Sequence, residues 1–193
     1  MNKISQQLIL RSTASQLLKR SATYSLIAVI CGAYLLQILI PSFEFDLALP
    51  NLDYLKATNE WYRLFTVALV HAGLLHLGFN MYALMVLGNP LEEAFGKNKL
   101  LIIFFFSLLT GSLTSAYFAS ASSYSVGASG AIFGLFGALA IVGNRIGADV
   151  RSIYVIIGVN FAIGFALGGV DWKAHLGGLV GGLISAQFIL NKR

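Results

Sequence analysis

Three histidines and one glycine-flanked serine are the residues of this chain best suited to chemistry. The serine is Ser129, in a Gly-Ala-Ser-Gly stretch, and the histidines are His71, His76 and His175. A serine hydroxyl becomes a nucleophile when an imidazole beside it takes its proton. Histidines also bind metal ions and carry protons. Nucleophilic catalysis, metal binding and proton transport are therefore the chemistries to compare.

Metal binding is the weakest of these interpretations. His71 and His76 are five residues apart, an awkward spacing for two ligands on one helix face, and no carboxylate accompanies them inside the apolar segments. The chain has a single cysteine, Cys31. A cysteine-based zinc site and an internal disulfide are therefore excluded. We predict no metal site and no cofactor.

The elements that must position these residues follow from the charges. Hydrophobic residues make up 57% of the 193 positions and charged residues only 11%, whereas a soluble domain has about 25% charged residues. Because a helix crosses a bilayer with about 20 apolar residues, the 45-residue segment 100–144 is long enough for two helices, separated by a polar break at 120–125. Segments without Asp, Glu, Lys or Arg are 21–43, 64–91, 100–144, 152–170 and 174–191.

These segments predict an all-α membrane protein, a polytopic bundle of six transmembrane helices. Backbone amides in lipid must be paired, which helices achieve internally, and the runs do not alternate as membrane strands would. We divide the chain into an N-terminal segment, 1–20, and a membrane domain, 21–193, with an outer loop at 41–63. That loop is rich in aromatic and aliphatic residues, so it either rests in the interfacial layer or is an ordinary ordered linker.

The basic residues set the orientation. With the N-terminus in the cytoplasm, ten of the 13 Lys and Arg residues fall on the cytoplasmic side, leaving only Lys56, Arg63 and Lys173 outside. We therefore predict that both termini are cytoplasmic, and we assign the net charge of +5 to membrane topology instead of nucleic-acid binding. Residues 1–20 form either an amphipathic helix on the membrane surface or a basic tail.

The predicted topology brings the polar residues together. Ser129, His175, His76 and Asn80 all fall in the outer half of the bundle, where polar side chains are costly and are functional candidates. Asn80 follows His76 by four residues, so the two share a helix face. Asp171, four residues before His175, either marks the water boundary or orients the imidazole.

Glycines favour close contact between the helices that carry the serine and the last histidine. Two small-xxx-small pairs, Gly177 with Gly181 and Gly178 with Gly182, follow His175. Such faces let helix backbones approach closely, which is what a serine–histidine hydrogen bond would require.

These patterns together resemble the rhomboid family of intramembrane serine proteases. The resemblance spans Trp61 to Gly182 and indicates the minimal six-helix form. Its four pieces are the tryptophan–arginine motif Glu60-Trp61-Tyr62-Arg63, the set His71, His76 and Asn80, the GxSG motif Gly127-Ala128-Ser129-Gly130, and Ala174-His175 with Gly178 and Gly182.

The resemblance implies a serine endopeptidase without a cofactor. Ser129 would be the nucleophile and His175 the general base, with His76, Asn80 and the Ser129 N–H as oxyanion donors. The substrates would be single-span membrane proteins cut near the outer end, in a multi-pass protein of the bacterial inner membrane; no nucleic acid is implied. Residues expected to support the site are Gly127, Gly130, His71, Arg63 and Phe133.

Two departures and three alternatives accompany this interpretation. Phe133 stands where some relatives have tyrosine, and Val67 where some have histidine. A proton-relay transporter would use the histidines but leaves the glycine-flanked serine unexplained. An inactive relative that binds membrane clients would have lost the serine or the histidine. A soluble hydrolase needs GxSxG, but Ala131 occupies the last glycine position.

Overall fold

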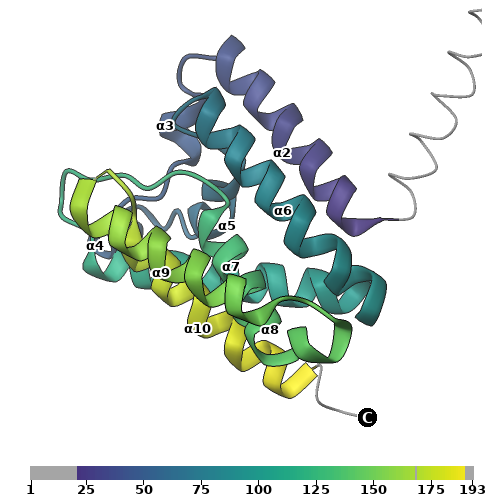
Figure 1. The fold of residues 1–193 in the computed structure, drawn as a ribbon. Helices are drawn as coiled ribbons and strands as arrows, with labels where there is room; N and C mark the ends of the chain where they lie inside the picture. The colour runs from purple at the N-terminus through teal and green to yellow at the C-terminus, as the bar shows by residue number, and fades with distance from the viewer. Residues whose placement is uncertain (1–20, 168, 190–193) are drawn as a thin grey trace, which may run out of the picture.

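The computed structural model describes residues 21–167 and 169–189, and the secondary structure in these ranges is helical (Figure 1). The two interpretations of residues 1–20 lie outside the described residues. Extended pairing in these ranges is limited to one isolated antiparallel bridge, between Leu49 and Ser125. The helices are α2 (Ala22–Leu39), α3 (Phe43–Leu47), α4 (Leu52–Thr58), α5 (Arg63–Thr66), η1 (Val67–Leu69), α6 (Leu74–Phe95), α7 (Lys97–Phe118), α8 (Ser129–Val142), η2 (Gly143–Ile146), α9 (Val150–Leu167) and α10 (Trp172–Ile189).

Several of these helices suit a membrane by length and composition. In the described ranges, α2, α7 and the stretch Ser129–Ile146 are each long and apolar enough to cross it. The α5–η1 segment and α6, bent by 100° at their junction, make a fourth span if they are counted as one. The prediction of an all-α, multi-pass membrane protein is confirmed. The count of six spans stays a prediction, because α9 is a shorter apolar helix and α10 contains four glycines and a lysine.

The centre of the bundle is formed by α7, α8 and α10, which pack against one another. Small residues make this packing possible. A Cβ atom at Gly178 would overlap the carbonyl oxygen of Gly130, and one at Gly182 would overlap that of Gly134. The backbones of α8 and α10 are therefore in direct contact, as the glycine pattern predicts.

Helix α2 lies alongside α6 (Figure 1) and is fastened to it at its N-terminus. The Glu92 carboxylate accepts hydrogen bonds from the hydroxyls of Ser21 and Thr23 and from the N–H groups of Ala22 and Thr23, at 2.6–2.9 Å. These N–H groups have no acceptor inside their own helix, and a negative charge there also complements the helix dipole. The half-buried Glu92 carboxylate thus pairs the first N–H groups of α2.

One expectation about local structure was wrong. The segment 64–91 is not one helix, because it breaks at Val70–Gly73 between η1 and α6, and His71 lies in that break instead of in the helix. The outer loop 41–63 contains two short helices, α3 and α4. Asn51 begins α4 by accepting a hydrogen bond from the Tyr54 N–H at 2.8 Å, a local capping signal.

Candidate active site

Ser129 is the first residue of α8, and the chain leading to it is fixed on both sides. Ser125 forms the bridge with Leu49, and the Gly127 N–H donates to the Val67 carbonyl at 2.9 Å. Gly127 has φ +114°, a conformation that side chains disfavour. The first N–H groups of a helix lack acceptors within it. The Ser129 hydroxyl therefore stands beside unpaired donors and the positive end of the helix dipole.

The structure brings Ser129 and His175 together from 46 positions apart. The Ser129 Oγ and His175 Nε2 atoms are 2.9 Å apart, a hydrogen-bond distance. His175 lies in the first turn of α10, and its neighbour Ala174 is close to Gly130 across the α8–α10 contact. A Cβ atom at Gly130 would lie 3.4 Å from the Ala174 carbonyl oxygen, so the two helices are in van der Waals contact where the hydroxyl and the imidazole meet.

Aromatic packing holds the His175 ring. The residue is 6% exposed, and its ring stacks on Phe133, with centroids 4.0 Å apart and planes 10° apart. The Phe161 ring lies nearly perpendicular to the same imidazole, at 77°, with centroids 6.5 Å apart. The Asp171 carboxylate is occupied elsewhere, since it accepts from the Ser115 hydroxyl and from the Ala174 N–H. Asp171 therefore caps α10 and makes no hydrogen bond to the imidazole.

His76 and Asn80 lie on the other side of the serine segment. The His76 ring faces Gly127: its Nε2 atom is 3.0 Å from where a Cβ of Gly127 would stand. The opposite ring nitrogen, Nδ1, accepts from the Ala72 N–H at 3.3 Å. Asn80, one turn further along α6, is buried and donates to the His76 carbonyl at 2.8 Å, which leaves its second amide hydrogen for another acceptor.

His71 is brought to the same place by the break in the chain. Its side chain is fully buried, and its ring centroid lies 5.1 Å from that of His76. Among the described residues, no three His, Cys, Asp or Glu side chains are grouped closely enough to hold a metal ion.

Arg63 organises the segment 41–63 through a buried side chain. Its side chain is 4% exposed and pairs with Glu60 at 2.5 Å. The same guanidinium donates to the carbonyls of Phe45 and Ala48 at 2.5 and 2.9 Å. The motif arginine thus fastens the segment around α3 to the start of α5, away from the Ser129–His175 contact.

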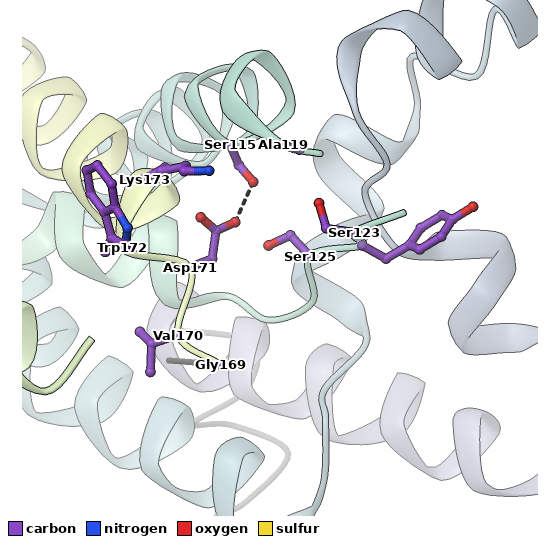
Figure 2. Close-up of a pocket in the computed structure, with 10 residues that line it drawn as sticks. Ser115, Ala119, Ser123, Ser125, Gly169, Val170, Asp171, Trp172 and Lys173 are labelled. Atoms are coloured by element: carbon purple, nitrogen blue, oxygen red, sulfur yellow. Dashed lines mark hydrogen bonds between the residues drawn. The ribbon is translucent and has the colours of Figure 1, made fainter. Parts of the chain in front are cut away.

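A polar cavity of about 270 Å³ is lined by Asp171, four residues before His175 in the sequence, and by Ser125, four residues before Ser129 (Figure 2). Asp171 points into it and bonds to Ser115, while Ser125 reaches toward Asp171 from the opposite wall. The hydroxyl and carboxylate groups make it a suitable place for water. Its lining is Ser115, Ala119, Ser123, Tyr124, Ser125, Gly169, Val170, Asp171, Trp172 and Lys173.

Two polar residues of this region were missed by sequence reasoning. Ser115 was hidden among many serines and threonines of the segment 100–144. Gln37 had a visible signal, because it is an amide side chain in the otherwise apolar C-terminal half of α2, where polar groups are costly. Its contacts involve backbone atoms of His71, which no sequence pattern reveals.

Comparison with known proteins gives a consistent result. A family model described as Rhomboid domain matches residues 58–192. The chain is 42% identical over 138 residues to Rhomboid protease GluP of Bacillus subtilis, and 40% identical over 149 residues to RHOMBOID-like protein 6, mitochondrial, of Arabidopsis thaliana. These matches cover 68% and 72% of this chain but only 27% and 48% of the two relatives. YdcA of Bacillus subtilis is 33% identical over 142 residues, 71% of each chain.

Proposed function

Because this chain belongs to the rhomboid family, whose proteases are intramembrane serine proteases, we propose that it is an intramembrane serine endopeptidase with Ser129 and His175 as its catalytic dyad. The single observation that carries the proposal is the 2.9 Å contact between the Ser129 hydroxyl and His175 Nε2. The chain spans less than half of the length of its first two relatives, so its activity is argued from its own residues.

The proposed reaction uses the dyad in two steps. The Ser129 oxygen attacks the carbonyl carbon of a peptide bond while its proton passes to His175 Nε2. The tetrahedral intermediate collapses, the imidazolium gives that proton to the leaving amine, and an acyl-enzyme remains. Water then attacks the ester with His175 again as base, which releases the acid and restores the serine. The polar cavity beside Asp171 offers water for this second step.

Three donors would stabilise the oxyanion. They are the Ser129 N–H at the start of α8, the Nε2–H of His76 and the remaining amide hydrogen of Asn80. These groups come from two helices that pack against each other, α6 and α8, so they are held in place before substrate arrives.

The proposed setting is a membrane domain, 21–193, of six spans with both termini in the cytoplasm of a bacterial inner membrane. The ten-to-three distribution of basic residues supports this orientation. The substrates would be single-span membrane proteins cut near their outer ends, since the dyad lies in the first turn of two helices that we place with their N-termini outward.

A fluorophosphonate probe tests the proposed nucleophile. The probe is expected to label the wild-type protein in membranes at Ser129, because only an activated serine reacts readily with it. Ser129→Ala should remove the label. Ser152→Ala, which changes an exposed serine at the start of α9, should keep it. An unlabelled wild-type protein that instead moves protons in vesicles would support the transporter interpretation and contradict this one.

Asn80→Ala is expected to lower kcat about a hundredfold to a thousandfold, which is typical for the loss of one oxyanion donor. KM should change little, because the donor acts on charge that develops only in the transition state. The measurement is steady-state cleavage of a single-span reporter in liposomes. A roughly hundredfold to thousandfold rise in KM with an unchanged kcat would instead assign Asn80 to substrate binding.

A further inference from the structure

Gln37 makes three hydrogen bonds from the outer end of α2, and none of the steps above uses them. Its Oε1 accepts from the His71 N–H at 2.9 Å, and its Nε2 donates to the His71 carbonyl at 2.8 Å. The same Nε2 donates to the Glu44 carboxylate at 2.7 Å. The amide orientation is thereby defined, because a flipped amide would place its oxygen against two acceptors.

The backbone that Gln37 holds is the break between η1 and α6. This stretch, Val70–Gly73, lies outside both helices, and its last carbonyl, at Gly73, accepts from the Leu77 N–H of α6. Its other backbone groups must find partners elsewhere. The side chain of Gln37 pairs with His71 as a neighbouring strand would, with one bond in each direction. An amide placed at membrane depth is costly unless it is paired, and here the pairing is complete.

The next residue connects this clamp to the proposed oxyanion site. The N–H of Ala72 donates to Nδ1 of His76 at 3.3 Å. A neutral imidazole that accepts at Nδ1 carries its proton on Nε2. Nε2 lies on the side of the ring that faces Gly127, two residues before Ser129. The His71 ring, packed 5.1 Å away, further limits rotation of His76.

We infer that Gln37 is a positioning residue for the oxyanion site: it holds the main chain at His71 so that the Ala72 N–H sets the tautomer and orientation of His76. This inference rests on the proposed function. Gln37 itself touches no reacting atom; it acts through two backbone groups and one ring. Its link to Glu44 also joins the clamp to α3 in the outer segment.

A double-mutant cycle tests the inference. Gln37→Met keeps the length of the side chain but removes the paired donors and acceptor, and it is expected to lower kcat about tenfold to a hundredfold with little change in KM. In a His76→Ala background the same change should lower kcat by less than about threefold, because the group it positions is already gone. Losses that multiply in the double variant would assign Gln37 a general structural role and overturn the inference.

Two controls separate this inference from the proposed function. Leu39→Met alters a lipid-facing position on the same helix, 74% exposed, and should keep wild-type kinetics. If Ser129→Ala is inactive while Gln37→Met cleaves like the wild type, the inference fails and the proposed function stands. If Ser129→Ala cleaves normally, the proposed function itself fails.

The tautomer of His76 gives an independent measurement on the unaltered protein. The chain has three histidines, so nuclear magnetic resonance of isotopically labelled imidazole nitrogens in bilayers can be assigned with single His→Gln variants. We expect a protonated Nε2 and an unprotonated, hydrogen-bonded Nδ1 at His76. A proton on Nδ1 in the wild type would overturn the inference, however the Gln37 variants behave.

Discussion

Replacing Ser129 with alanine is expected to abolish cleavage of a membrane-anchored reporter while the helix bundle stays intact. Loss of a serine nucleophile lowers kcat by a factor on the order of 10⁴–10⁶ in serine proteases. Ser129 is half-buried at the first position of α8, where alanine is well tolerated in a helix. The measurement is the rate of reporter cleavage in liposomes, with thermal stability recorded on the same preparation.

Variants of His175 test the same dyad from the side of the general base. His175→Ala should remove activity to a similar extent, and the double variant should be no worse than either single one, because the two groups act as a unit. Ser152→Ala, an exposed serine-to-alanine change remote from the site, should retain full activity. Cleavage by Ser129→Ala at the wild-type rate would refute the dyad, as would independent, multiplying losses in the double variant.

The sequence was sufficient to predict the helical class and the close packing of the two helices that carry Ser129 and His175. Charge-free runs located the long helices, because the cost of burying charge in lipid acts on every residue of a span. The polar break at 120–125 was placed correctly, and Ser129 indeed begins the helix after it. The glycine pattern also predicted the close contact of α8 and α10, since a Cβ there has no space.

The break at Val70–Gly73 was beyond sequence reasoning for a physical reason. Its residues, Val70, His71, Ala72 and Gly73, include no Asp, Glu, Lys, Arg or proline, so the charge-free run 64–91 continues through it. What stabilises the break is distant in the sequence: the Gln37 amide bonds to the His71 backbone, 34 positions away. The same holds for Asp171, whose partner Ser115 lies 56 positions away. A hydrogen bond between a side chain and a backbone group or hydroxyl far away in the sequence produces no periodic pattern of residue types, so the sequence does not reveal it.

The geometry of the dyad depends on a contact between two backbones, and Gly178→Ala should disrupt it. The added Cβ would overlap the carbonyl oxygen of Gly130, the residue after Ser129. A backbone carbonyl cannot rotate away as a side chain can, so α8 and α10 must separate. Overpacking of this kind costs roughly 1–3 kcal/mol of stability, and a displacement of about 1 Å at the reacting atoms costs about a hundredfold in rate.

A Gly→Ala change at a glycine with free space around it serves as the control, because it adds the same methyl group without pushing α8 and α10 apart. Gly158, in α9, has open space where its Cβ would stand. Gly158→Ala should therefore keep full activity and gain slightly in stability from the higher helix propensity of alanine. Both variants are assayed well below their unfolding temperatures, so that a loss of rate reflects geometry and not unfolding. If Gly178→Ala cleaves at the wild-type rate and is as stable as the wild type, the α8–α10 spacing can relax without moving Ser129 from His175. The aromatic packing around the imidazole would then be what aligns the dyad.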